Sequence, residues 1–163
     1  GLEHKIVMHG GGGYGDKPAA MERLIQNCLR LPAYVRRRLI LENDERLYTV
    51  ADMLAVSERT DLPVVIDWLH DRANPSDESG RASLARRAFA TWKEEDGIPE
   101  VHFSSQKQGS RPGSHSEYVD AGEFLQMYEE LADLEFDCEL EAKAKDLALL
   151  SLRQQLSQLP LSR

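Results

Sequence analysis

Five short apolar segments alternate with stretches of helical periodicity along this chain, and no other feature restricts its fold as strongly. The strands are expected at residues 5–9, 38–42, 62–67, 100–104 and 135–141. They are short and almost continuously apolar, as strands buried on both faces of a parallel sheet usually are. Because helices separate them, we expect an α/β fold with a parallel sheet and right-handed crossovers, made of about five βα units.

The helical segments carry recognisable start signals. Residues 17–31 place apolar side chains at i, i+3, i+4, i+7 and i+8, and Asp16 in front of them is a suitable N-cap. Thr49 opens another helix, with Asp52 three residues later as a capping-box variant. Helices are expected over residues 17–31, 49–60, 80–93 and 145–158, with one more after an Asp120 cap, a short helix or turn at 31–38, and a polar loop after the third strand.

Length and composition limit the class of protein. The chain has 163 residues, whereas a complete (β/α)8 barrel usually needs about 250, so we expect residues 1–163 to form a single partial domain. The net charge of −8 argues against a simple electrostatic nucleic-acid binder, and no apolar run approaches the ~18 residues of a membrane span. Cys28 and Cys138 are far apart in apolar surroundings, which predicts reduced thiols and a cytoplasmic location.

Ionisable side chains occur at or near the carboxyl end of every expected strand. These residues are His9, Glu42, Asp67, His102 and Glu141. His70 follows the third strand closely, and His115 lies in the loop after the fourth. In parallel βα folds the chemistry lies beyond the carboxyl ends of the strands, because the loops converge there. The seven side chains are therefore expected to share one face of the molecule.

Mixed imidazoles and carboxylates suit Zn²⁺, Mn²⁺ or Fe²⁺. Seven such residues exceed the needs of one four-coordinate ion and predict a cluster of two or three metals, which activates water and stabilises a phosphoryl displacement. Each residue also has a plainer interpretation: a lone strand-end histidine is more often a hydrogen-bonded core residue, Glu42 could be a loop carboxylate, and Asp67 could simply pair with His70. The metal site is favoured because all the plainer interpretations would have to hold together.

The glycine-rich segment at residues 10–14 superficially suggests a phosphate-binding loop. It lacks the GK[ST] sequence that would follow in a Walker motif, so that interpretation is poor. Glycine here more plausibly allows the backbone to approach a ligand near His9 closely.

Four motifs carry a resemblance to a known family: LENDERLYT at 41–49, VHFSS at 101–105, GSHS at 113–116 and LEAKAKD at 140–146. Together with the stretch around KIVMHGGGGYGDK, they resemble the UV damage endonuclease family, in order and spacing, over nearly the whole chain. That family has a TIM-barrel fold, and its members nick DNA immediately 5′ to ultraviolet photoproducts. The resemblance implies that this chain corresponds to strands four to eight of the barrel.

The resemblance also implies roles for individual residues in a manganese-dependent phosphodiesterase that uses metal-activated water. Glu42 would bridge two ions, and Asp67, His102 and Glu141 would complete the central pair, with Glu42, Asp67 and Glu141 as the catalytic carboxylates. His9 would bind the ion that faces the missing strands. His70 and His115 would hold a third ion.

The sequence departs from the family in two further positions near these ligands. The family usually has a lysine, often carboxylated, where this chain has Glu100, which could bind metal directly, through water, or not at all. Leu69 replaces the first of two paired histidines and leaves His70 alone. Lys143, just beyond Glu141, could orient that ligand or bind phosphate.

Damaged duplex DNA is the partner that the resemblance implies. The candidate contacts lie in polar loops at the same face and are Tyr14, Lys17, Arg46, Arg72, Lys107 and Arg111. Phosphate contacts of this kind position DNA without reading its sequence. The plainer interpretation is that they are ordinary solvated loop charges. An open five-stranded sheet also exposes its edges, so we expect either a homodimer or a missing N-terminal half to cover them.

Two other functions remain open at this point. A sugar isomerase or epimerase of the same superfamily would turn over a small polyol and ignore DNA, although GSHS and LEAKAKD match the endonuclease better. A non-catalytic half-barrel would bind metal weakly, and Glu100 and the missing strands motivate that alternative.

Overall fold

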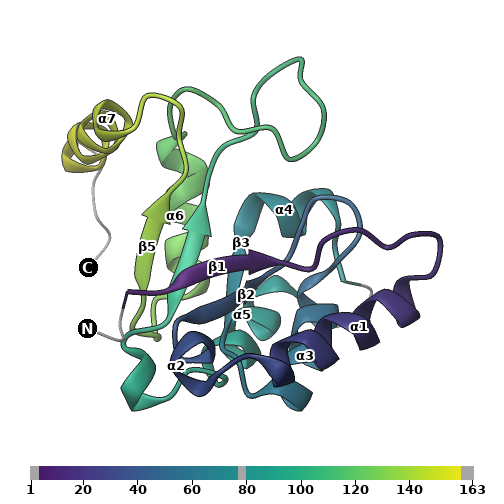
Figure 1. Cartoon of the computed structure of the whole chain (residues 1–163). Coiled ribbons are helices and arrows are strands. Elements are labelled where there is room, and N and C mark those ends of the chain that lie inside the picture. The colour runs from purple at the N-terminus through teal and green to yellow at the C-terminus, as the bar shows by residue number, and fades with distance from the viewer. Residues whose placement is uncertain (1–3, 77–79, 159–163) are drawn as a thin grey trace.

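One parallel sheet organises the molecule. The computed structural model describes residues 4–76 and 80–158, and the rest of the expected domain at 1–163 lies outside these residues. The strands lie side by side in chain order and are β1 (Ile6–His9), β2 (Leu39–Glu42), β3 (Val64–Asp67), β4 (Glu100–Phe103) and β5 (Asp137–Leu140) (Figure 1). Every expected strand is present, and each neighbouring pair is parallel.

Helices follow the strands as expected. They are α1 (Lys17–Arg30), α2 (Ala33–Arg36), α3 (Val50–Thr60), α4 (Trp68–Ala73), α5 (Arg81–Phe89), α6 (Ala121–Glu130) and α7 (Asp146–Gln158), with a 3-10 turn η1 (Glu94–Asp96). Three predicted caps are confirmed: Asp16 accepts from the Ala19 backbone N–H, Thr49 forms a capping box with Asp52, and Asp120 accepts from the Glu123 N–H.

Two predictions about the helices are wrong. Helix α4 occupies the start of the expected polar loop, because the Asp67 side chain accepts from the His70 N–H and caps a new helix directly at the strand end. Helix α5 ends at Phe89, four residues before residue 93. Beyond the helix end, two side chains form hydrogen bonds with the backbone of β3. Thr91 Oγ1 accepts from the Val64 N–H at 2.8 Å, and Trp92 Nε1 donates to the Val64 carbonyl at 2.8 Å.

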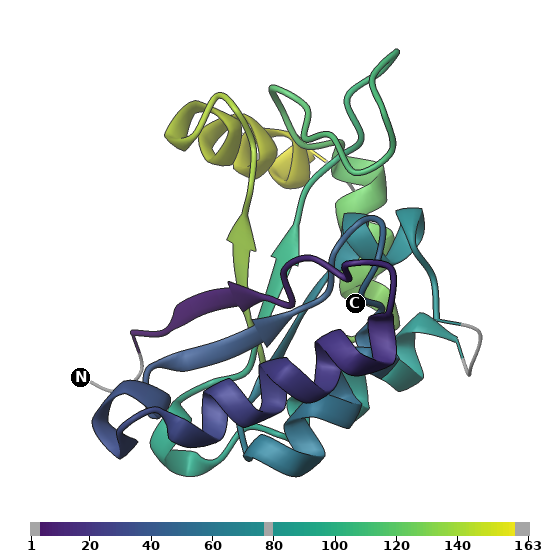
Figure 2. The ribbon, with the colours of Figure 1, turned by 45° about the vertical axis from the view of Figure 1, so that its right-hand side comes forward.

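The hydrophobic core lies between the sheet and its helices. Helix α1 packs against α3, and α3 packs against α5 and against strands β2 and β3 (Figure 2). Leu41, Ile66 and Phe103 point into this layer and are buried. Side chains alternate between the two faces of a strand, so their neighbours Glu42, Asp67 and His102 point to the opposite face.

The cysteines and the helix lengths bear on two expectations from composition. Cys28 is buried and Cys138 is half-buried, and both are free thiols. Among the helices at residues 4–76 and 80–158, none combines the length and the apolar character that crossing a membrane requires.

Candidate metal centre

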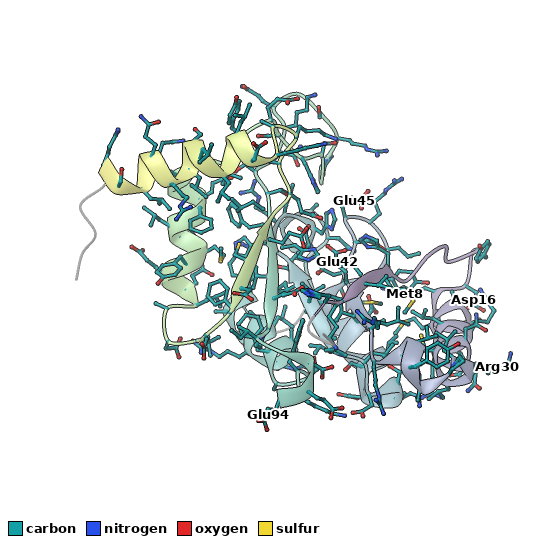
Figure 3. All side chains as sticks on the ribbon, turned by 60° about the vertical axis from the view of Figure 1, so that its left-hand side comes forward. Met8, Asp16, Arg30, Glu42, Glu45 and Glu94 are labelled. Atoms are coloured by element: carbon teal, nitrogen blue, oxygen red, sulfur yellow. The ribbon has the colours of Figure 1, made fainter. Side chains whose placement is uncertain are left out.

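The register of the sheet brings the strand-end residues together. His9 is the partner of Glu42 across β1 and β2, and Asp67 is the partner of His102 across β3 and β4. Partners in neighbouring parallel strands point to the same face, so the four side chains share one side of the sheet. Figure 3 shows Glu42 and Glu45 near one end of the sheet and Glu94 at the opposite end. The structure therefore places these side chains at the end that the sequence predicts.

Four side chains form a central cluster. Glu42, Asp67, His102 and Glu141 each offer a ligand atom, and these atoms all lie within 4.8 Å of one another. His102 Nδ1 lies 2.9 Å from Glu42 Oε1 and 3.9 Å from Glu141 Oε1. Asp67, Glu42 and His102 are almost completely buried, whereas Glu141 is partly exposed.

His9 joins this cluster through Glu42. Its Nε2 lies 3.0 Å from Glu42 Oε2, so the two oxygens of Glu42 face two different histidines. That arrangement suits a carboxylate that bridges two metal ions. His9 is half-exposed and lies outside the groups whose ligand atoms all fall within 4.8 Å.

A second cluster shares Asp67 with the first. Asp67, His70 and His115 also offer ligand atoms within 4.8 Å of one another. His70 Nδ1 lies 3.4 Å from Asp67 Oδ2 and 3.2 Å from the Asn43 carbonyl oxygen, and the rings of His70 and His115 are 5.6 Å apart. A hydrogen bond from Nδ1–H to that carbonyl leaves Nε2 of His70 with a free lone pair, as metal-binding histidines commonly have.

Local structure fixes Asp67 and His70 in place. The Asp67 Oδ1 atom accepts from the His70 backbone N–H at 2.7 Å, which starts α4 at the strand end. Asn43, the residue directly after β2, forms two hydrogen bonds with the backbone of Asp67: its Oδ1 accepts from the Asp67 N–H at 2.9 Å and its Nδ2 donates to the Asp67 carbonyl at 3.1 Å. The other carboxylate oxygen, Oδ2, is buried and accepts no hydrogen bond from residues 4–76 or 80–158.

A folded-back loop delivers His115. After β4 the chain extends beyond the strand ends and returns (Figure 1), so that Gln106 and His115 form an antiparallel bridge and the Lys107 N–H donates to the Ser114 carbonyl at 2.7 Å. Gly113 allows this loop to approach the segment after β2, because a Cβ atom there would lie 2.4 Å from Cβ of Glu45. Residues distant in sequence thus meet at the second cluster.

Burial and crowding make the metal-free centre electrostatically unfavourable. Burial raises the pKa of Asp67 well above its usual range; the His70 N–H bond opposes this, while the Glu42 and Glu141 charges raise it further. Burial lowers the pKa of His115, and although the Glu141 carboxylate opposes this, the net shift is downward.

The pKa of His102 is raised despite burial. Burial by itself lowers its pKa, but the hydrogen bond to Glu42 and the surrounding carboxylates outweigh burial and raise the pKa to about 9. Without a metal, the imidazole thus serves as the cation among these carboxylates.

The residues present fit a divalent cation. The donors are imidazole nitrogens and carboxylate oxygens, the set that Mn²⁺, Zn²⁺ and Fe²⁺ accept. Among the described residues the buried Oδ2 atom of Asp67 has no hydrogen-bond partner, although His70 Nδ1 lies 3.4 Å away, and the carboxylate belongs to both clusters. A cation there would satisfy this oxygen and offset the crowded negative charge.

A cavity adjoins the clusters. It has a volume of about 460 Å³, and its lining includes His9, Gly11, Gly12 and His70. The preceding Gly10 lies against the ring of Tyr48, where a Cβ atom would meet the ring at 2.5 Å. At Gly10 the close approach that glycine allows is therefore to the Tyr48 ring, and the approach of the backbone to a ligand near His9 stays a prediction.

Glu100 and Lys143 lie at the margin of the site. Glu100 is outside both clusters of the described residues, and burial raises its pKa. It starts β4 two residues before His102, so it points to the same face but farther from the strand end. Lys143, with His115 and Glu141, lines a cavity of about 300 Å³.

The candidate DNA contacts differ in their surroundings. Three of them have acidic partners: Lys17 pairs with Asp52 at 2.6 Å, Arg46 with Glu45 at 3.1 Å and Arg72 with Glu123 at 2.9 Å. The remaining candidates are Lys107 and Arg111, on the loop that carries His115, and Tyr14, which is 87% exposed and has the Arg23 guanidinium 5.7 Å from its ring centre.

Sequence reasoning missed two residues of the site. Asn43 holds Asp67 and receives the His70 hydrogen bond, and Glu139 lies 3.6 Å from His102. The signal for Glu139 was the alternation of acids at positions 137, 139 and 141, which points all three to one face of β5. Asn43 carried no such signal, because its role depends on the neighbouring strand.

The fold and site together define a partial (β/α) barrel with clustered carboxylates and imidazoles at the carboxyl ends of its strands. Comparison with known proteins narrows this class. The chain belongs to the UV-endonuclease UvdE family, whose model matches residues 1–161.

Relatives and a solved structure agree with this assignment. A UV DNA damage endonuclease of Bacillus velezensis is 40% identical over 154 residues, which are 93% of this chain and 48% of that protein. Another, from Bacillus cereus, is 38% identical and covers the same shares. The crystal structure of SacUVDE superposes with a TM-score of 0.84 at 32% identity, over 95% of this chain and 53% of the other. The chain thus spans about half the length of the relatives that it matches.

Proposed function

We propose that this chain carries the metal centre of a DNA-repair endonuclease that cuts the phosphodiester bond immediately 5′ to ultraviolet photoproducts. The observation that carries the proposal is the pair of clusters that share Asp67. Family membership supports it, because the curated relatives are named UV DNA damage endonuclease. Such an enzyme acts on DNA inside the cell.

The two clusters suggest a metal-binding role for each side chain. Glu42 would bridge two cations, His9 would bind the one near β1, and Asp67, His102 and Glu141 would complete the central pair. His70 and His115, with Asp67, would hold a third cation. Manganese is the metal proposed. When bound, divalent cations lower the pKa of water and neutralise charge that develops on the phosphate oxygens.

The protein's own contribution is positioning. Asn43 and the α4 cap hold Asp67 and His70 rigidly, and the loop with Lys107 and Arg111 lies next to His115, where its cations can contact phosphate groups. The cavity lined by His9 and His70 leaves space for a phosphodiester beside these two histidines.

The test combines metal binding with strand cleavage. Isothermal titration with Mn²⁺ is expected to give saturable binding of more than one ion per chain, and irradiated duplex is expected to be nicked only when Mn²⁺ is present. Glu42→Gln should abolish both, whereas Glu94→Gln, at the opposite end of the sheet, should change neither. Because the chain corresponds to about half of its relatives, cleavage is expected of a complete barrel that contains it. A folded, metal-loaded complete barrel that leaves irradiated duplex intact would overturn the proposal.

One alternative has an observation in its favour. Because the chain spans about half of its relatives, a half-barrel that binds metal without catalysis is the main competitor. It predicts metal binding below one equivalent and no cleavage under the same conditions. Turnover of a polyol without affinity for DNA would instead indicate a sugar isomerase or epimerase, which no structural observation favours.

A further inference from the structure

His102 has one ring nitrogen in the central cluster and the other on the far side of the ring. Nδ1 lies 2.9 Å from Glu42 Oε1, within the group of ligand atoms. Nε2 is buried and has no hydrogen-bond partner in the part of the chain that the structure describes. A buried ring N–H without a partner is unfavourable, so an acceptor close to Nε2 would stabilise this orientation of the ring.

That acceptor belongs to β5. Glu139 Oε2 lies 3.6 Å from His102 Nε2, close to hydrogen-bond distance. The register of β4 and β5 pairs the two residues directly, so both side chains point to the face that carries the clusters. Glu139 is 64% exposed, which leaves its side chain room for the small rotation that completes the bond.

We propose that Glu139 is a positioning residue for the metal centre: its carboxylate accepts a hydrogen bond from Nε2–H of His102 and thereby keeps Nδ1 as the nitrogen that faces Glu42, Asp67 and Glu141. This inference rests on the proposed metal site. Histidine ligands commonly donate their second N–H to a carboxylate or carbonyl, which fixes the ring and its tautomer. His70 shows the same arrangement with the Asn43 carbonyl.

The chain offers a matched control for this role. Asp137 lies on the same strand and the same face as Glu139, but its register partner is Glu100. Asp137→Asn removes the same charge near the site without touching His102. Glu139→Met removes the acceptor, and Glu139→Gln replaces the carboxylate with a neutral acceptor oxygen of the same reach.

The first measurement uses the metal-free chain. In ¹H–¹⁵N spectra of histidine side chains, the Nε2–H proton of His102 is expected to exchange slowly with solvent in the wild type and in Asp137→Asn. It should exchange faster in Glu139→Met, and Glu139→Gln should restore much of the protection. Equal exchange in the wild type and Glu139→Met, in a correctly folded variant, overturns the proposal.

The second measurement follows metal binding. Glu139→Met is expected to weaken Mn²⁺ binding at least about tenfold in isothermal titration, within the range known for such orienting partners, while Asp137→Asn should change it little. In spectra of the Zn²⁺-loaded chain, His102 should bind through Nδ1 in the wild type. An equal loss of affinity in both variants would indicate a general charge effect and contradict the proposal. If the wild type binds no metal, the proposed function fails, while the metal-free measurement still decides the role of Glu139.

Discussion

Asp67 combines two tasks on one carboxylate. Its Oδ1 atom caps α4 through the His70 N–H, and its Oδ2 atom is buried without a hydrogen bond to any described residue, while the carboxylate belongs to both clusters. Burial and the neighbouring carboxylates raise its pKa, so the metal-free protein holds a group whose ionisation is unfavourable. A carboxylate in this position lowers the free energy of unfolding of the metal-free protein and favours the binding of a cation.

Replacement of Asp67 separates these tasks. Asp67→Asn keeps a capping oxygen, since Asn and Asp are equivalent N-caps, and removes the buried charge. We expect the metal-free variant to be more stable than the wild type at pH 7 by about 1 kcal/mol or more. Thermal unfolding between pH 4 and pH 8 measures this difference.

The sign of the pH dependence follows from the raised pKa. In the unfolded protein the pKa of Asp67 is roughly 4. Below that pH the carboxyl group is protonated in both the folded and the unfolded protein, so it does not lower the free energy of unfolding. As the pH rises from there towards the folded pKa, only the unfolded state ionises, so this group makes the wild type progressively less stable and leaves Asp67→Asn unaffected. A constant difference between the two proteins across this range would refute the argument.

Among the structural elements, the loop after β4 depends on one close contact. Gly113 has φ +79° and lies against Glu45, whereas Gly109 has a similar φ of +70° and no atom within 4 Å of the position of a Cβ. Gly109→Ala is therefore expected to lower the free energy of unfolding by only about 1 kcal/mol, from backbone strain. Gly113→Ala should lower it by about 1–3 kcal/mol more, because Glu45 or the loop must also move.

The loop also carries His115, so Gly113→Ala has a second expected effect. Displacement of the loop should weaken Mn²⁺ binding at the cluster of Asp67, His70 and His115, and Gly109→Ala should leave it unchanged. Thermal unfolding and isothermal titration on both variants measure these effects. Identical behaviour of the two variants would show that the contact with Glu45 is unimportant.

Helix α4 is held to α5 by a partly buried ion pair. Arg81 Nε donates to Asp71 Oδ2 at 2.8 Å, and its guanidinium lies 4.8 Å from the centre of the Trp68 ring. Asp71 is buried, so Arg81→Ala leaves an unpaired carboxylate and is expected to lower the free energy of unfolding by about 2 kcal/mol. Urea unfolding provides the measurement. Arg86→Ala, which breaks an exposed pair with Asp133, is the control and should have little effect; comparable losses would contradict the role of burial.

The sequence was informative where the signal is local. Strand positions follow from apolar runs, and Asp16, Thr49 and Asp120 are caps whose partners lie three residues away. Helix α4 has only six residues, too few to show amphipathic periodicity, and its cap is a residue interpreted as a ligand. The contact between Glu139 and His102 depends on the register of β4 and β5, which the spacing along one chain does not determine.

At the scale of the whole molecule, charge and fold are linked. The chain carries a net charge of −8, and the central cluster concentrates three carboxylates, Glu42, Asp67 and Glu141, at the face proposed to meet DNA. We expect this face to repel phosphate groups when no metal ion is bound. Divalent ions would reverse the local field, so that the residues that contribute to the acidity of the chain would hold cations that attract DNA.

This reversal predicts that affinity for duplex DNA requires metal. In gel-shift or anisotropy titrations at low ionic strength, Mn²⁺ is expected to strengthen binding at least about tenfold relative to EDTA, since electrostatic contacts dominate such affinity. Asp67→Asn should lose most of this gain, because its carboxylate belongs to both clusters. Lys107→Ala should instead weaken binding modestly with and without metal, because its cation would contact phosphate directly. Equal affinity in Mn²⁺ and EDTA would show that the loops alone bind DNA and that the metal centre takes no part in recruiting it.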